Sequence, residues 1–94
     1  MYIGKIGTMA FVYILQSEKN NRYYIGSTND IRRRLAEHLS GKTASLKHLL
    51  PVKLVFSQNV TSLGDARRIE IKLKKYKSRV ILEKIIKDGT ILGL

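Results

Sequence analysis

Short apolar runs separated by polar turns and amphipathic segments predict three strands and three helices along this chain. Aromatic and β-branched residues dominate 11–15 and 22–27, and apolar positions alternate through 52–60, with Val52, Leu54 and Phe56 expected on one face. Such runs are typical of β-strands. The polar residues 18–21 between the first two strands are typical of a turn, so we expect a hairpin there.

The length of the hairpin loop decides which side chains lie together. Directly opposed residues of an antiparallel pair lie on one face. A loop with an even number of residues therefore places Tyr13, Tyr24 and Gly26 on one face, together with Phe11 and Leu15. A loop with an odd number would put the two tyrosines on opposite faces. We predict the even loop.

Capping residues and apolar spacing predict the first helix. Thr28 to Asp30 supply N-cap candidates for a helix over about 30–40, which ends near Gly41. Arg34 and His38 are four residues apart and are expected along the helix edge, next to the sheet rather than under it. The expected buried stripe consists of Ile31, Leu35 and Leu39.

Two further helices complete the pattern after a basic connector over 41–50. Thr61 or Ser62 caps a helix that extends to about Tyr76, and Ser78 begins a last helix that stops at Asp88 and Gly89. The order β-β-α-β-α-α indicates the α+β class, with a three-stranded antiparallel sheet flanked by helices. We expect the domain to span 10–88, with a flexible N-terminal extension over 1–9 and a C-terminal tail over 89–94. The expected core face of the second helix consists of Ala66, Ile69, Leu73 and Tyr76, and the expected apolar positions of the last are Val80, Ile81, Ile85 and Ile86.

Composition narrows the functional classes. The chain has 94 residues with 18 Lys+Arg against 7 Asp+Glu, a net charge of +11, and this favours a polyanionic partner, nucleic acid first. It contains no cysteine, which excludes disulfides, zinc–thiolate sites and thiol nucleophiles. No apolar run approaches the ~20 residues needed to span a bilayer. We expect a cytoplasmic protein that binds DNA, with no membrane and no small-molecule cofactor.

Several residues suit chemistry on a phosphodiester, which needs a water, a group to accept its proton and positive charge on the phosphate. Arg34 can bind a phosphate oxygen bidentately. Glu70 is a hard oxygen ligand suited to Mg²⁺ or Mn²⁺. His38, Tyr13 or Tyr24 can orient or deprotonate the water.

Taken singly, each candidate has a simpler interpretation. Tyr13 and Tyr24 are ordinary strand aromatics, and Arg34 is one more solvated cation of a basic helix. His38 fits a helix surface. Glu70 precedes Lys74 by four residues, so a weak helical ion pair accounts for it. Composition and spacing alone therefore reach a basic α+β nucleic-acid binder and stop short of an enzyme.

Four ordered segments together resemble the GIY-YIG endonuclease family, above all its small stand-alone members. The likeness covers about residues 10–87. Two positions depart from the family pattern, because Phe11 stands where the first half-motif has glycine and Ser27 stands where some members have lysine. The segments are Phe11-Val-Tyr-Ile-Leu15, Tyr24-Ile-Gly through His38, Pro51-Val-Lys-Leu-Val-Phe56, and Ala66 to Lys75.

The resemblance implies a role for each candidate. Tyr13 and Tyr24 match the tyrosines of the two half-motifs, Arg34 matches the catalytic arginine, and His38 falls where members carry His or Tyr. Glu70 matches the single acidic metal ligand. Members cleave DNA with one divalent metal, usually Mg²⁺, and a tyrosine as general base.

The expected function is therefore a metal-dependent endonuclease that hydrolyses DNA phosphodiester bonds, with a role in repair or recombination. Sequence specificity is expected to be weak, because binding would rest largely on phosphate contacts. The alternative is a non-catalytic basic module that binds nucleic acid and keeps the nuclease fold. The residues expected to contact nucleic acid are Gly26, Ser27, Arg32, Arg33, Lys42 and Lys47.

Overall fold

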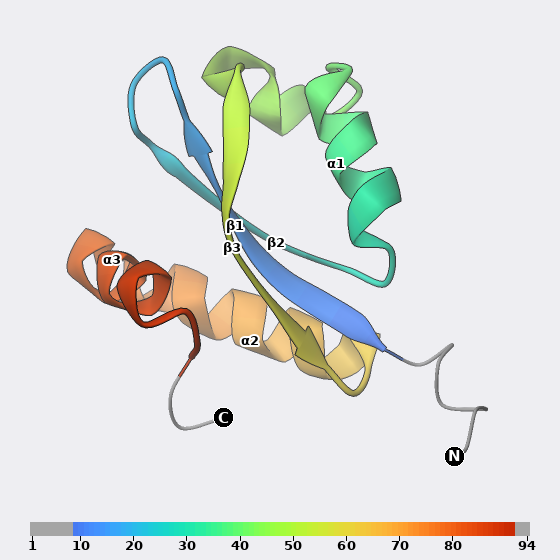
Figure 1. Cartoon of the computed structure of the whole chain (residues 1–94), viewed down its shortest axis with the longest axis vertical. Coiled ribbons are helices and arrows are strands. Elements are labelled where there is room, and N and C mark those ends of the chain that lie inside the picture. The colour runs from blue at the N-terminus through green and yellow to red at the C-terminus, as the bar shows by residue number, and fades with distance from the viewer. Residues whose placement is uncertain (1–8, 92–94) are drawn as a thin grey trace.

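The computed structural model describes residues 9–91. It contains a three-stranded antiparallel sheet with helices on both faces. The strand order is β2-β1-β3, so β1 is central. Helix α1 and the 3₁₀ helix η2 lie on one face, and α2 and α3 lie on the other (Figure 1). The α+β fold class is confirmed. The elements are β1 (Ala10–Ser17), β2 (Tyr23–Thr28), α1 (Ile31–Leu39), η2 (Ala44–Leu49), β3 (Val52–Val60), α2 (Leu63–Tyr76) and α3 (Arg79–Asp88).

The register of the β1–β2 hairpin confirms the even loop. Tyr13 pairs with Gly26, and Leu15 pairs with Tyr24. The last pair before the turn is Gln16 with Tyr23, and the Ser17 N–H donates to the Arg22 carbonyl at 2.8 Å, which leaves residues 18–21 in the loop. The two tyrosines of the motif therefore lie on the same face of the sheet.

Each face of the sheet has its own hydrophobic cluster. On the α2–α3 side, Val12, Ile14 and Ile25 of the hairpin pack against residues of the two helices. On the α1 side, Tyr13 and Leu15 pack against η2 and the start of β3. Because successive residues of a strand point to opposite faces, β1 contributes to both clusters and is almost wholly buried.

A bulge in β3 makes the predicted alternation of that strand wrong. Ile14 pairs with Phe56, whereas Leu15 pairs with Leu54, so Val55 is the extra residue. An inserted residue reverses the side that the following residues face. Val52 consequently packs in the cluster on the α1 side, while Phe56 is buried on the α2–α3 side.

Helix α1 presents a different stripe from the one predicted. His38 is 0 % exposed and is the buried residue of this helix, whereas Leu39 is 59 % exposed. Ile31 and Leu35 are half-buried. The buried stripe therefore consists of positions 31, 35 and 38, spaced i, i+4, i+7, and does not include position 39. The prediction that His38 lies at the helix edge is therefore wrong, and its burial depends on polar partners described below.

The connector after α1 is also more ordered than predicted. Residues Ala44–Leu49 form the 3₁₀ helix η2, in which positions i and i+3 lie on one side. Leu46 is fully buried and Leu49 is 6 % exposed, and both pack against Tyr13 and Leu15 in the same cluster. This segment therefore closes the core on the α1 side.

Serine caps begin both C-terminal helices. Ser62 accepts a hydrogen bond from the Asp65 N–H at the start of α2, and Ser78 accepts one from the Ile81 N–H at the start of α3. Ala66 and Leu73 are buried as predicted, but Tyr76 is half-exposed. The buried residues of α3 are Leu82 and Ile85, while Val80, Ile81 and Ile86 are exposed or only partly buried.

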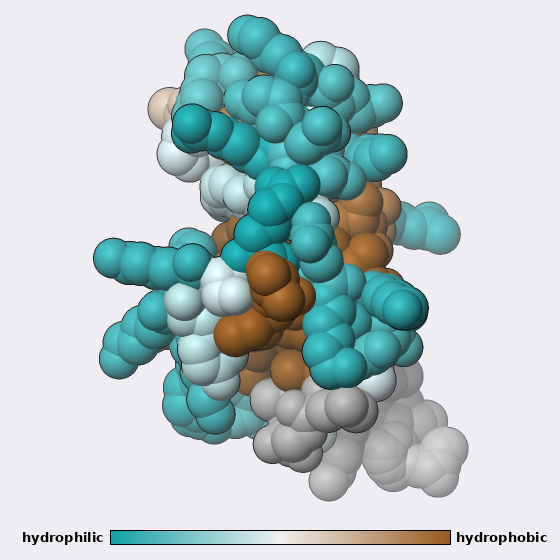
Figure 2. Space-filling view, turned by 90° about the vertical axis from the view of Figure 1, so that its left-hand side faces the viewer, coloured by the Kyte–Doolittle hydropathy of each residue, from teal (hydrophilic) through white to brown (hydrophobic). Residues whose placement is uncertain are grey.

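The face of the molecule that carries α3 has hydrophobic residues at its centre with hydrophilic residues projecting around them (Figure 2). Beyond α3, the Gln58 side chain accepts hydrogen bonds from Thr90 and from the Ile91 N–H, so the packed unit continues to Ile91. The predicted flexible extension falls almost entirely on residues 1–8, outside the described residues. No helix within 9–91 is long and apolar enough to cross a membrane.

Replacing Leu46 with alanine tests the structural role of η2. We expect Leu46→Ala to lower the free energy of unfolding by about 2–5 kcal/mol, because it leaves a cavity in a closed cluster. The matched variant Leu39→Ala removes the same atoms from an exposed position and should change it by less than about 0.5 kcal/mol. Urea denaturation of both variants measures the difference, and equal losses would contradict the role of Leu46 in closing the core.

Candidate active site

The candidate residues converge on the sheet from separate elements. Tyr13 lies on the central strand β1 and Tyr24 on the edge strand β2, both facing α1. Arg34 and His38 come from α1, above this face. The His38 ring lies 5.8 Å from the Tyr13 ring and 5.4 Å from the Tyr24 ring, measured between centroids. Histidine therefore brings both motif tyrosines into one cluster.

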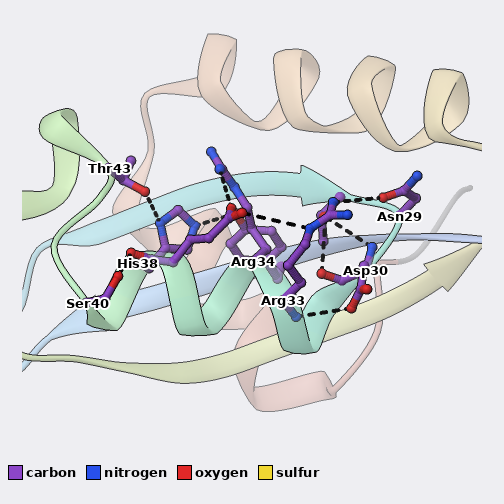
Figure 3. A network of polar contacts seen from close by, with 10 residues as sticks. Asn29, Asp30, Arg33, Arg34, His38, Ser40 and Thr43 are labelled. Atoms are coloured by element: carbon purple, nitrogen blue, oxygen red, sulfur yellow. Dashed lines mark hydrogen bonds and ion pairs between the residues drawn. The ribbon is translucent and has the colours of Figure 1, made fainter.

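A buried chain of hydrogen bonds holds His38 in place. Its Nε2 lies 2.7 Å from the Tyr13 hydroxyl, and its Nδ1 lies 2.8 Å from the Thr43 hydroxyl (Figure 3). Both ring nitrogens thus have partners, and no buried side-chain nitrogen or oxygen in the described residues is left unpaired. Because a buried polar group is costly only when its hydrogen bonds are unmade, this chain allows the imidazole to occupy the core.

Burial sets the protonation states of the cluster. It raises the pKa of Tyr13 to about 12, although the neighbouring Arg34 guanidinium works against the rise. Burial, followed by the positive charge of Arg34, lowers the pKa of His38, with Glu37 opposing. Near pH 7 the phenol and the imidazole are therefore both neutral. The charge of Arg34 beside the phenol oxygen favours donation from the Tyr13 hydroxyl to Nε2 and from Nδ1–H to Thr43.

Gly26 makes room for the Tyr13 ring. A Cβ at position 26 would overlap the hydroxyl end of Tyr13, which lies directly across the hairpin. Gly26 itself is buried. The glycine of the Tyr-Ile-Gly motif therefore has a local physical role, because any side chain there would displace the phenol that holds His38.

Arg34 lies at the opening of the cluster. Its guanidinium donates to Glu37 at 3.0 Å, and its side chain is 36 % exposed. That hydrogen bond raises the pKa of Arg34 further above its ordinary value, so it stays charged. The start of α1 is held by Asp30, which accepts from the Arg33 N–H, while the Arg33 guanidinium reaches Asn29 (Figure 3).

Glu70 approaches from the other face of the sheet. It belongs to α2 and accepts a hydrogen bond from Ser27, a β2 residue that faces α2. Its second oxygen accepts from Lys74 at 2.6 Å, so the helical ion pair predicted as the simpler interpretation is present. The carboxylate meets the hairpin at the edge strand, and its negative charge contributes to the raised pKa of Tyr13 across that edge.

The donor set around Glu70 suits a divalent cation that takes only one protein ligand. No group of three or more metal-binding side chains occurs within the described residues. A hard carboxylate oxygen with water and phosphate as the other ligands is typical of Mg²⁺ sites. Ser27 and Lys74 each use one lone pair of the carboxylate, and the Lys74 side chain is 53 % exposed and able to turn into solvent. The residues present therefore fit such an ion.

The residues predicted to contact nucleic acid divide into two groups. Ser27 and Gly26 form the first group and belong to the candidate site itself: Ser27 is hydrogen-bonded to Glu70, and Gly26 lies beneath Tyr13. The second group consists of exposed cations on α1, η2 and the loop between them, namely Arg32, Arg33, Lys42 and Lys47.

Thr43 belongs to the candidate site but was not predicted from the sequence. The only signal in the sequence is a hydroxyl residue five positions after a histidine.

These features define a small α+β domain with a polar cluster at one edge of its sheet. A family model described as the GIY-YIG catalytic domain matches residues 9–85. The chain belongs to the GIY-YIG family, a nuclease family, as the sequence resemblance implied.

Named relatives agree with this assignment. The chain is 45 % identical over 69 residues to a UPF0213 protein of Streptococcus pneumoniae serotype 4, covering 72 % of this chain and 69 % of that protein. It is 40 % identical over 82 residues to a UPF0213 protein of Lactococcus lactis subsp. cremoris, covering 86 % and 83 %. The solution NMR structure of a UPF0213 protein from Bacillus halodurans matches with a TM-score of 0.52 at 31 % identity, covering 84 % and 83 %.

Substituting Gly26 tests its role beneath Tyr13. We expect Gly26→Ala to lower the free energy of unfolding by about 1–3 kcal/mol, because the added methyl overpacks a buried ring. The control Gly64→Ala adds a methyl with its nearest neighbour 3.8 Å away and should be neutral or stabilising by up to about 1 kcal/mol. Thermal and urea unfolding measure both, and a neutral Gly26→Ala would contradict the close approach.

The lowered pKa of His38 predicts a pH dependence of stability. Its folded-state pKa lies below the unfolded value of about 6.5. As the pH falls from about 7.5 to 5.5, the unfolded chain therefore binds more protons than the folded one, and the free energy of unfolding should decrease. Denaturation at several pH values measures the slope. His38→Gln should flatten the slope, whereas replacing the exposed His48 by glutamine should preserve it.

Proposed function

We propose that this chain is a divalent-metal-dependent endonuclease that hydrolyses DNA phosphodiester bonds with weak sequence specificity. The observation that carries the proposal is the gathering of Tyr24, Arg34 and Glu70 at the β2 edge, backed by the buried Tyr13–His38–Thr43 chain. A role in DNA repair or recombination belongs to the same proposal. The net charge of +11 supports a polyanionic substrate.

Burial separates the groups that can touch substrate from those that hold them. Tyr13 is 1 % exposed and His38 is 0 % exposed, so neither reaches a substrate directly. Tyr24, Arg34 and Glu70 are each partly exposed. We therefore assign contact with the reacting phosphate and water to this outer group, and positioning to Tyr13 and His38.

Each outer residue has a distinct task. Arg34 remains charged and binds non-bridging phosphate oxygens, where negative charge builds up in the transition state. The Tyr24 hydroxyl orients the attacking water and takes part in removing its proton. His38 packs edge-on against the Tyr24 ring and fixes its orientation. The ester oxygen that leaves is protonated from solvent at this open edge.

Glu70 would hold the divalent ion, with Ser27 orienting the carboxylate through the other oxygen. The ion, when bound, supplies Lewis-acid polarisation of the phosphate and neutralises its developing charge. Lys74 must release its oxygen of Glu70 to open that ligand position. The chain thus contributes one carboxylate and one arginine of opposite charge on either side of the edge strand.

Cleavage of plasmid or branched DNA in Mg²⁺ or Mn²⁺ tests this assignment. We expect Arg34→Ala and Glu70→Gln each to lower the cleavage rate at least about 100-fold, because each loses charge opposite the phosphate or metal. Glu70→Gln retains an oxygen for Ser27, so its folding should be preserved. Lys53→Ala, which removes an exposed β3 cation, should retain activity. EDTA should abolish cleavage by the parent protein and by this control variant. Equal rates in all variants would point to a contaminating nuclease and overturn the proposal.

A second candidate is a non-catalytic module that binds nucleic acid. The observation in its favour is that both oxygens of Glu70 already have protein partners, Ser27 and Lys74. This module would bind DNA with an affinity that falls steeply with salt, and it would show neither Mn²⁺ binding nor nicking. Nicking by the purified protein that is abolished in Glu70→Gln eliminates it.

A further inference from the structure

A basic hollow of about 420 Å³ lies beside the candidate site and is lined by residues of the hairpin and of the junction between α2 and α3. The turn of the β1–β2 hairpin and the junction between α2 and α3 lie on the same side of the molecule (Figure 1). Four cationic residues line the hollow, and no carboxylate belongs to its lining. The polar and aromatic residues that matter for binding are Arg22, Tyr23, Tyr24, Lys74, Lys77 and Arg79.

Two lining residues connect the hollow to the candidate site. Tyr24 belongs to the edge strand that lines the hollow, and its ring packs against His38 on the α1 side. Lys74 lines the hollow and also binds Glu70. A strand whose phosphate sits at Arg34 and Glu70 would therefore continue directly into this hollow. A depression on α2 that is lined by Arg68, Lys72 and Lys75 shares neither residue.

Arg79 gives the hollow a prepared stacking surface. Its guanidinium lies 4.5 Å from the centroid of the Tyr23 ring and donates to the Asn21 carbonyl at 2.9 Å and to Glu83 at 3.0 Å. The Arg79 side chain is nonetheless 50 % exposed. One face of the planar Arg79 guanidinium covers the Tyr23 ring. Unpaired bases stack on guanidinium planes of this kind and on tyrosine rings.

Lys77 lines the hollow from a backbone conformation that favours glycine. It ends α2 with φ of 47° and ψ of 36°, the left-handed region in which a residue with a Cβ is disfavoured by roughly 1 kcal/mol. A lysine at this helix end therefore costs stability and adds a cation to the lining. Neither Lys77 nor Arg22 forms an ion pair within residues 9–91, so both are available to phosphates.

We propose that this hollow binds a single DNA strand next to the cleavage site, so that the substrate is DNA in which a duplex opens into a single strand. The inference rests on the proposed nuclease function and extends it to a substrate class. Cations beside aromatic rings are the combination that binds single strands. The hollow is bounded by β2 and the α2–α3 junction and accommodates one strand, with phosphates on Arg22 and Lys77 and a base on the Arg79–Tyr23 stack.

Equilibrium binding tests the strand site separately from cleavage. Fluorescence anisotropy in EDTA compares a fork with one single-stranded arm and a blunt duplex with the same number of phosphates. We expect tighter binding to the fork. Arg22→Ala and Lys77→Gly should each weaken fork binding at least threefold. Each should also make the negative slope of the logarithm of the association constant against the logarithm of the salt concentration shallower by about 0.7 per lost contact. Blunt-duplex affinity should change less.

The control variants are matched in charge. Lys53→Ala and Lys87→Ala each remove one exposed cation from positions outside the hollow and should preserve the preference for the fork. Lys77→Gly should fold at least as stably as the parent, so its lost binding cannot reflect unfolding. Equal affinity for fork and duplex, equal losses in all four variants, or tighter binding of the matching RNA fork would overturn the proposal. Fork preference without cleavage would instead support the strand site and overturn the nuclease function.

Discussion

The hydrogen bond between Tyr13 and His38 is the interaction on which the rest of this structure depends. It joins the central strand to α1 inside the core, and Thr43 satisfies the remaining imidazole nitrogen. The arrangement requires glycine at position 26, since the phenol occupies the space of a Cβ there. One buried polar chain therefore sets the rotation of α1 and the position of the following 3₁₀ helix.

That rotation places the exposed candidate site residues at the edge of the sheet. With His38 facing inward, Arg34 lies one turn earlier at the rim, and Tyr24 is held edge-on by the imidazole. Glu70 reaches the same edge from the opposite face through Ser27. A site assembled around an edge strand is open to a long polymer, which suits a nucleic-acid backbone better than a small molecule.

The sequence predicted much of the fold and the list of candidate residues. Strand propensity, serine caps and the polar segment 18–21 are local signals, so the element order and the even hairpin loop followed from them. The bulge at Val55 could not be foreseen, because it depends on pairing across strands. The same holds for Leu46 and Leu49, whose burial depends on the space left beneath α1.

The sequence by itself determined the charge, the exclusion of thiol chemistry, the order of the strands and α-helices, and the order of the family motif. Only the tertiary structure decided which motif residues are accessible. Tyr13 and His38 became interior because each satisfies the other, whereas Tyr24, Arg34 and Glu70 stayed at the surface. Helical periodicity cannot distinguish position 38 from 39 as the inward residue. That choice depends on a hydroxyl 25 residues away in sequence, which meets the imidazole only once the sheet and α1 have packed together.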